Sequence, residues 1–148
     1  MDWVASIHQA IQYIEEHLRE ELTIREIAQQ AALSPFYFQK GFAMLCGITA
    51  GDYIRQRRLS AAGLEVLTTD RKIIDIALEF GYDSPDSFTK AFVRFHGLTP
   101  AALRKSGGAV RSFAPLRIKL TLEGGQNMDC KIMKKEAFTV LCLSLIHI

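Results

Sequence analysis

The sequence predicts an all-α domain over residues 1–106, built from two helix-turn-helix units joined by a long helix, with a short β fragment after it. Three observations predict this fold. A segment repeats at an offset of 49 to 50 residues, each copy contains a Ser-Pro helix start, and the hydrophobic pattern changes from helical to alternating after Gly107-Gly108. A chain of 148 residues is long enough to bury one core of ordinary size.

The internal repeat defines two equivalent segments. Residues 24–28 (IREIA) recur as residues 73–77 (IIDIA), and Ser34-Pro35 recurs as Ser84-Pro85 after one extra residue near Asp83. Further along, the matching pairs are Phe38 and Phe88, Lys40 and Lys90, Phe42 and Phe92, Gly47 and Gly97, and Thr49 and Thr99. A repeat of this length indicates one structural unit used twice.

Each copy is typical of a helix, a short turn and a second helix. In the first copy, Thr23 and Glu26 form a capping box that begins the first helix, and the chain turns near Leu33. Ser34 then caps the second helix, while Pro35 takes its first position without losing a hydrogen bond. The apolar rows of the two second helices are Phe38, Phe42 and Leu45, and Phe88, Phe92 and Phe95.

Three further helices are expected around the two units. An opening helix has an apolar stripe over residues 3–18, and a long helix that begins after Thr49 joins the units. Gly63 lies inside the long helix and weakens it by about 1 kcal/mol relative to alanine. A short last helix begins at Thr99-Pro100 and ends at Gly107-Gly108.

The charge balance excludes a simple electrostatic argument for nucleic acid. The chain has 18 Lys/Arg and 16 Asp/Glu, but residues 1–106 have 12 and 13, so the predicted helical domain is slightly acidic. The placement of charges therefore matters more than their sum.

Several classes of protein are not indicated. No apolar run reaches the ~20 residues that cross a bilayer, and the start lacks the basic flank of a secretory signal, so we expect a cytoplasmic protein with no membrane partner. Cys46, Cys130 and Cys142 have neither disulfide nor zinc spacing. Because no phosphate loop, nucleophile elbow or acid–base pair is found, we predict that the protein is not an enzyme and has no catalytic residue, metal or cofactor.

The second helix of each unit has the pattern of a helix that enters the DNA major groove, which is ~12 Å wide. The residues that avoid the apolar rows are Phe36, Gln39 and Lys40 in the first unit, and Asp86, Thr89 and Lys90 in the second. Gln pairs bidentately with adenine, and Lys pairs with guanine. The alternative is that each of these is only a solvated polar residue, but their equivalent places in two copies favour contact with bases.

Basic residues and the capping serines are candidates for phosphate contacts that fix the register on double-stranded DNA. These candidates are Ser34, Arg55, Arg57, Arg58, Ser84, Arg94, Arg104 and Lys105. For some of the arginines, the alternative is an ion pair with Asp or Glu inside the protein. The acidic cluster within residues 15–21 is expected to lie away from the phosphates, which would repel it.

Residues 22–105 contain a series of characteristic motifs, which are Ile27-Ala28, Tyr53-Ile54-Arg55, Arg57-Arg58-Leu59, residues 73–77, Phe80-Gly81-Tyr82, Phe88, Phe92 and Gly97-Leu98-Thr99-Pro100. With these motifs, the segment resembles the DNA-binding domain of AraC/XylS-type transcription regulators. The resemblance implies a seven-helix domain that inserts both recognition helices into successive major grooves on one face of the DNA. It also implies RNA polymerase as a further partner.

The same resemblance implies base contacts at seven positions. They are Phe36, Gln39, Lys40, Pro85, Asp86, Thr89 and Lys90. Pro85 and Asp86 depart from the family's pattern in chemical type, because proline has no amide donor and aspartate repels phosphate. The second unit is therefore expected to read DNA shape or to bind more weakly than the first.

The last third of the chain predicts strands. Alternating apolar residues occur at Leu116, Ile118, Leu120 and Leu122, and again at Met128, Cys130 and Ile132 after a turn at Gly124-Gly125. We interpret residues 107–115 as a linker and residues 116–142 as part of a truncated α+β domain. Residues 143–148 (LSLIHI) resemble the translation of a sequencing adapter, which predicts a non-native tail.

This fragment resembles the opening of a GyrI-like effector-binding domain. The resemblance implies a small-molecule effector, often cationic or amphipathic, that binds in the complete protein only, because the fragment is too short to close a pocket.

The function predicted from the sequence is a sequence-specific DNA-binding transcription regulator. Two other classes stay open at this point. One is a small-molecule-binding or sequestering protein that uses the helical pair for protein contacts. The other is an enzyme with such a DNA-binding module, which needs a reactive cysteine, whereas the place of Cys46 beside Gly47 favours a core position.

Overall fold

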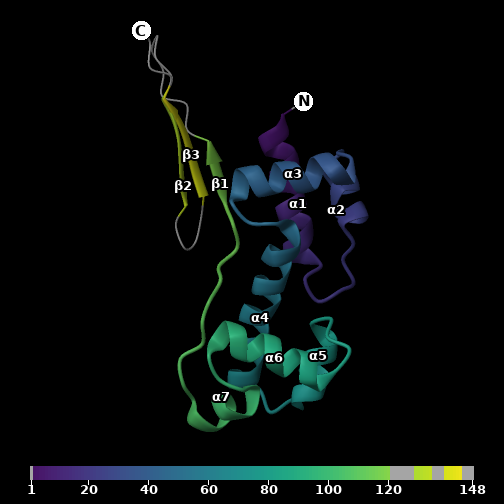
Figure 1. The fold of residues 1–148 in the computed structure, drawn as a ribbon, viewed down its shortest axis with the longest axis vertical. Helices are drawn as coiled ribbons and strands as arrows, with labels where there is room; N and C mark the ends of the chain where they lie inside the picture. The colour runs from purple at the N-terminus through teal and green to yellow at the C-terminus, as the bar shows by residue number, and fades with distance from the viewer. Residues whose placement is uncertain (1, 121–128, 135–138, 145–148) are drawn as a thin grey trace.

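The computed structural model describes residues 2–120, 129–134 and 139–144, and within them the chain forms seven helices followed by three strands (Figure 1). The helices are α1 (Trp3–Glu16), α2 (Ile24–Gln30), α3 (Pro35–Cys46), α4 (Ala50–Thr68), α5 (Ile73–Glu79), α6 (Pro85–His96) and α7 (Pro100–Ser106). The strands are β1 (Ile118–Leu120), β2 (Asp129–Lys134) and β3 (Thr139–Ser144). The helical architecture predicted for residues 1–106 is confirmed.

The caps predicted from the sequence begin the helices where they were expected. The hydroxyl of Thr23 accepts a hydrogen bond from the Glu26 amide at 3.2 Å, and the Glu26 carboxylate accepts one from the Thr23 amide at 3.1 Å. The Thr23 hydroxyl also donates to the Glu26 carboxylate at 2.8 Å, and this bond, with the smaller effect of the one from the Thr23 amide, lowers the pKa of Glu26. Ser34 and Ser84 cap α3 and α6 through their hydroxyls, which accept from the amides of Tyr37 and Ser87, and each serine is followed by proline in the first helical turn.

Two hydrophobic cores are arranged along α4, one for each helix-turn-helix unit (Figure 1). The first contains Phe38 and Phe42 of α3, and the second contains Phe88 and Phe92 of α6. From α4, Tyr53 and Ile54 belong to the first core, whereas Leu59, Ala62 and Val66 belong to the second. The long helix is therefore an integral part of both units as well as the connection between them.

The turns inside the two units share one backbone conformation. Ala32 has a φ of 55° and the equivalent Gly81 has a φ of 85°. The following amides close matching bonds, Leu33 to the Ala28 carbonyl and Tyr82 to the Ala77 carbonyl, each at 2.9 Å. The left-handed region is costly for a residue with a Cβ atom, so Ala32 is strained where Gly81 is not.

Gly63 does not interrupt α4, because the helix is continuous over 19 residues. A Cβ atom at this position would lie 2.5 Å from both Cε1 of His96 and Cγ1 of Val110. The missing side chain therefore admits the ring of His96, which is 5% exposed and lies 2.8 Å from the Leu59 carbonyl through Nε2. His96 is thus part of the packed interior of the second unit.

Residues 107–117, which we name the strap, form no helix or strand and run along α4 from the second unit to the first (Figure 1). The Arg111 amide donates to Nδ1 of His96 at 3.2 Å, and the Phe113 amide donates to the Ser60 hydroxyl at 3.0 Å. Leu116 is buried in the first core, and Val110 packs against the second. The segment predicted as a linker is therefore packed against the helical domain.

The three strands form one sheet in the order β1-β3-β2, with β1 parallel and β2 antiparallel to β3. β3 includes Leu143 and Ser144, the first two residues of the predicted non-native tail. Residues 145–148 of that tail and the Gly124-Gly125 turn lie outside the described residues. The nature of the tail and the identity of the truncated domain stay predictions.

Within the described part of the chain, no helix is long and apolar enough to cross a membrane. In the same residues, no three His, Cys, Asp or Glu side chains are grouped closely enough to hold a metal ion.

The paired turns predict opposite effects for two reciprocal substitutions. Ala32→Gly should raise the free energy of unfolding by about 0.5–1 kcal/mol, because relief of the left-handed strain exceeds the added entropy of the unfolded chain. Gly81→Ala should lower it by about 1–2 kcal/mol, since it introduces that strain and brings a Cβ atom within 3.0 Å of Arg58. Urea denaturation followed by circular dichroism measures both, and a loss of stability in Ala32→Gly would contradict the strain at Ala32.

The burial of His96 predicts a pH dependence of stability. Desolvation, with a smaller effect from the nearby Arg111, lowers the pKa of His96 below its usual 6.5. The unfolded chain therefore binds a proton more readily, so stability is complete above pH 6.5 and declines as the pH falls toward the folded pKa. Melting temperatures between pH 7.5 and 5.5 should fall further for the wild type than for His96→Gln, whereas exposed His8→Gln should retain the wild-type slope.

Candidate nucleic-acid interface

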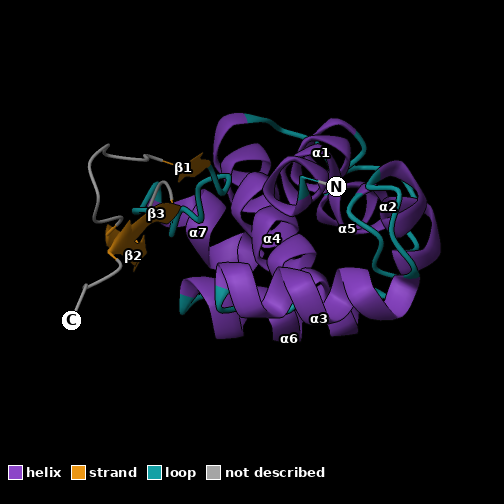
Figure 2. Ribbon diagram, turned by 90° about the horizontal axis from the view of Figure 1, so that it is seen from above, coloured by secondary structure: helices purple, strands orange, loops and turns teal. Residues whose placement is uncertain are grey.

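Helices α3 and α6 lie on the same side of α4 and run in similar directions (Figures 1 and 2). Seen from above in Figure 2, they occupy one edge of the molecule, whereas α1, α2 and α5 lie toward the other edge. The 19 residues of α4 span about 28 Å, close to the ~34 Å of one DNA turn. The fold thus presents exposed surfaces of two helices on one side of a connecting helix whose length is close to one DNA turn.

The predicted base-contacting residues of α3 are all exposed. Phe36 is 67% exposed, and the Lys40 ammonium lies 5.8 Å from the centre of its ring. Together with Gln39, these side chains border a hollow of about 650 Å³ that extends to the beginning of α4. Tyr37, which the sequence reasoning missed, is 64% exposed and lies on the same face, and its spacing of three residues from Lys40 was the signal that could have found it.

The equivalent surface of α6 is less suited to anions. Pro85, Asp86 and Lys90 are exposed, and Thr89 is half-buried. The Lys90 ammonium pairs with the Asp86 carboxylate at 3.0 Å across one helical turn. This pair partly neutralises the aspartate that the sequence analysis identified as a departure, and it also occupies the lysine.

Three of the predicted phosphate contacts, Arg57, Arg58 and Arg104, point into the protein. Arg57 forms a bidentate pair with Glu15 at 2.8 Å and donates to the Phe113 carbonyl at 2.5 Å. Arg58 donates to the carbonyls of Leu18 and Glu20 at 2.9 and 2.7 Å.

Arg104 donates to the Val66 carbonyl at 3.0 Å and is half-buried. For Arg57, Arg58 and Arg104 the structure therefore favours a role inside the fold over the phosphate contact predicted from the sequence. The exposed basic candidates are Arg55, Arg94 and Lys105, while Ser34 and Ser84 lie at the beginnings of α3 and α6.

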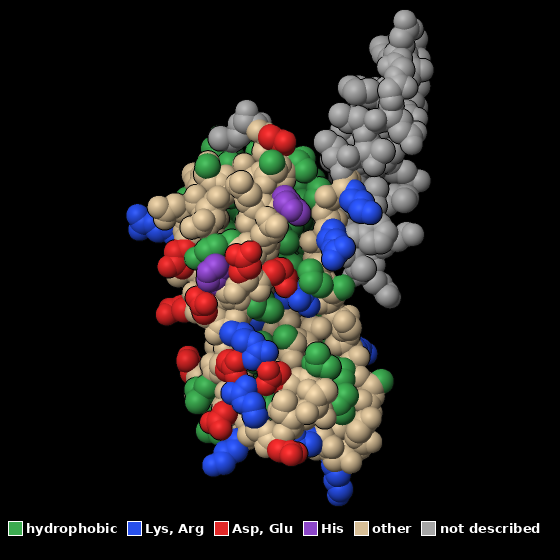
Figure 3. All heavy atoms as spheres, turned by 180° about the vertical axis from the view of Figure 1, so that it is seen from behind, with side chains coloured by type: hydrophobic (Ala, Val, Ile, Leu, Met, Phe, Trp, Pro, Cys, Tyr) green, Lys and Arg blue, Asp and Glu red, His purple; other side chains and the backbone are tan. Residues whose placement is uncertain are grey.

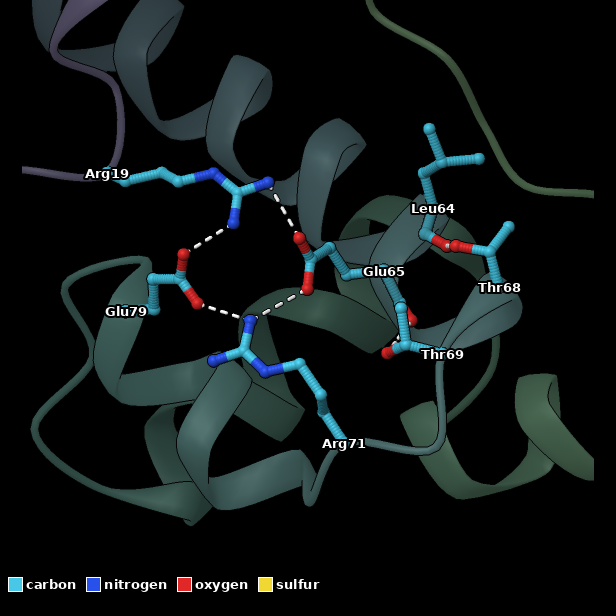
Figure 4. A network of polar contacts seen from close by, with 7 residues as sticks. All are labelled: Arg19, Leu64, Glu65, Thr68, Thr69, Arg71 and Glu79. Carbon is cyan, nitrogen blue, oxygen red and sulfur yellow. Dashed lines mark hydrogen bonds and ion pairs between the residues drawn. The ribbon is translucent and has the colours of Figure 1, made fainter.

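A second group of ion pairs braces α4 against α5 (Figure 4). Glu65 of α4 binds Arg19 at 2.6 Å and Arg71 at 2.9 Å, and Glu79 of α5 binds the same two arginines. Hydrogen bonding to Arg19 is the main cause that lowers the pKa of Glu79. The guanidinium of Arg19 also lies 5.1 Å from the centre of the Phe80 ring.

These contacts connect the chain segment after α1 to the second helix-turn-helix unit. They therefore help to fix how the two units are oriented relative to each other. Because the four side chains are partly exposed, the brace should weaken at high salt.

The face opposite α3 and α6 has many acidic side chains, which are interspersed with basic ones (Figure 3). The two exposed recognition helices lie on the other side of the molecule (Figure 2). The acidic side chains of this face therefore point away from the candidate DNA-binding side.

Comparison with known proteins agrees with this geometry. Residues 27–106 match a family model described as a helix-turn-helix domain. The regulatory protein SoxS of Escherichia coli K12 is 41% identical over 98 residues, which cover 66% of this chain and 92% of SoxS. The crystal structure of an AraC-type transcriptional regulator from Chromobacterium violaceum has the same fold, with a TM-score of 0.65, 22% identity, and coverage of 70% of this chain and 92% of that one.

A further similar structure is the DNA-binding domain of AdpA, a global transcriptional factor, in complex with a target DNA. It has a TM-score of 0.63 and 26% identity, and the match covers 72% of this chain and 93% of that domain. This chain therefore belongs to the AraC-type family of helix-turn-helix transcription regulators.

Proposed function

We propose that this regulator binds duplex DNA sequence-specifically, with α3 and α6 in successive major grooves on one face of the duplex. The observation on which this depends is the pair of exposed helices on one side of α4, at the spacing that α4 sets. The solved complex of the similar AdpA domain with its target DNA supports the proposal. Because α3 and α6 belong to cores that share α4, both helices are held in place before DNA arrives.

In this proposal, α3 reads most of the sequence. Gln39 and Lys40 supply donors and acceptors for base edges, and Phe36 supplies apolar contact, for example with a thymine methyl group. On α6, Thr89 and Lys90 supply polar contacts, while Pro85 and Asp86 supply no positive charge. We infer that α6 adds less affinity than α3 and responds more to groove shape.

Phosphate contacts in this proposal come from two kinds of group. The first kind is the backbone amides at the beginnings of α3 and α6, where Ser34 and Ser84 lie. In the proposed complex, these amides and the positive ends of the two helix dipoles point toward the DNA phosphates. Arg55, Arg94 and Lys105 are the exposed cations that can neutralise phosphates and set the register.

We further propose that the strands after the strap belong to an effector-binding domain. RNA polymerase and a small-molecule effector are the further partners that this architecture implies, and the cytoplasm is the compartment where such a regulator meets DNA. The similar proteins are regulators rather than enzymes, which fits a non-enzymatic role. They do not favour a sequestering protein that uses the helices for protein contacts.

Two recognition helices on one side predict the shape of the footprint. A duplex selected from a random pool should show two protected major-groove segments about one turn, or roughly 10 base pairs, apart on the same face. Hydroxyl-radical cleavage of the complex measures this directly. One protected segment, or two on opposite faces, would be incompatible with simultaneous insertion of α3 and α6.

Reading and anchoring residues should differ in how they affect specificity. Gln39→Ala should weaken binding to the selected duplex by about 1–3 kcal/mol and to random duplex far less, because only base discrimination is lost. Lys105→Ala should weaken both duplexes about equally and reduce the slope of log affinity against log salt by roughly 0.9. Fluorescence anisotropy at several salt concentrations distinguishes the two variants. If Gln39→Ala lost the same affinity for both duplexes, the proposal that α3 reads the sequence would be wrong.

A further inference from the structure

A pocket outside the two recognition surfaces lies where α4, α6 and the strap meet. It has a volume of about 350 Å³, and three arginines from these three elements line it: Arg55, Arg94 and Arg111. Its apolar lining consists of Leu59, Ala91 and Phe95. The strap thus contributes one cation to a site whose other two belong to the helical domain.

The position of this pocket along α4 places it between the recognition helices. The hollow beside α3 includes Gly51, in the first turn of α4, whereas this pocket includes Arg55 and Leu59, one to two turns later, together with α6. When α3 and α6 occupy successive major grooves, the stretch of backbone between these grooves passes this part of α4.

The charges in the pocket are only partly balanced by the described residues. All three arginines are exposed, and within the described residues neither Arg94 nor Arg111 forms an ion pair. Arg55 pairs with Asp52 at 2.7 Å, an exposed contact between neighbouring turns that a phosphate can replace at little cost. Three cations around an apolar surface repel one another, and a bound anion relieves that repulsion.

The strap is held in the position that brings Arg111 to the pocket. The backbone amide of Arg111 donates to Nδ1 of His96, and two residues later the Phe113 amide donates to the hydroxyl of Ser60 in α4. Because these bonds use backbone amides, they are independent of the arginine side chain. The Arg111 guanidinium can therefore be changed while the path of the strap is retained.

We propose that Arg55, Arg94 and Arg111 form a binding site for a phosphodiester group of the DNA backbone between the two major grooves. This inference rests on the proposed function and adds a phosphate contact from outside the helix-turn-helix domain. It means that the segment leading to β1 contributes directly to DNA affinity.

The test compares Arg111→Gln with Arg117→Gln, which removes the same charge from an exposed position on the strap outside the pocket. On a selected duplex, Arg111→Gln should weaken binding by about tenfold, the order expected for one charge-assisted hydrogen bond, and should reduce the salt slope by roughly 0.9. Random duplex should show the same loss. Arg117→Gln should bind like the wild type, and unchanged melting temperatures verify that both variants fold.

A second arm identifies the source of the phosphate. Replacing the phosphates between the two protected segments by uncharged methylphosphonates should weaken the wild type and abolish the difference between the wild type and Arg111→Gln. A difference that persists on this duplex, or an Arg111→Gln affinity equal to that of Arg117→Gln, would overturn the site.

A free anion is tested with inorganic phosphate and ATP in the absence of DNA. Stabilisation of the wild type but not of Arg111→Gln at micromolar ATP, with no effect of the methylphosphonates, would assign the pocket to a soluble ligand and overturn the proposal. Absence of any duplex binding by the wild type would instead refute the proposed function itself, so the two failures are distinguishable.

Discussion

The structure depends on the sharing of one helix by two hydrophobic cores. Tyr53 of α4 is buried with Phe38 and Phe42, and Val66 of the same helix is buried with Phe88 and Phe92. Neither core can form completely without α4, so α4 cannot rotate relative to one unit without disturbing its packing. The separation and orientation of α3 and α6 therefore follow from the length and twist of a single rigid element, which is the property that reading two grooves requires.

Polar contacts reinforce this arrangement and explain how a slightly acidic domain can present a DNA-binding side. Glu15 is bound by Tyr53 and Arg57, and Glu65 and Glu79 are bound by Arg19 and Arg71. Each of these carboxylates faces cations of its own protein, so its field at a distance is reduced. Burial raises the pKa of Tyr53, which keeps its hydroxyl protonated as a donor to Glu15. Among the exposed cations near α3 and α6, Arg55 and Lys90 pair with Asp52 and Asp86, whereas Arg94 and Lys105 form no ion pair within the described residues.

Local chemistry made much of the fold predictable, whereas contacts distant in sequence made the roles of the arginines unpredictable. Ser34-Pro35 and Ser84-Pro85 specify helix starts within a few residues, and the structure has α3 and α6 there. Arg55 and Arg57 lie two residues apart on one helix, but only Arg57 faces Glu15, which is 42 residues away in the chain. No pattern in the sequence of α4 shows which of these guanidinium groups points inward. The same limit applies to Phe113 in the predicted linker, because it is held by contacts with Ser60 and Tyr53, which lie more than 50 residues earlier in the chain.

The strap adds a third connection between the two units, and its contacts are of a different kind from the others. Val110 and Leu116 anchor the strap to the two cores by apolar packing. In addition, three backbone amides of the strap each donate one hydrogen bond to a side chain, and the acceptors are His96, Ser60 and Tyr53. A pull on β1 would act first on the Leu116 amide and its bond to Tyr53, and Tyr53 also binds Glu15. Tyr53 therefore connects the segment that leaves the helical domain with the polar contacts that hold α1 to α4. The strap therefore contacts the first unit at Tyr53 and lines the three-arginine pocket through Arg111, within one short segment.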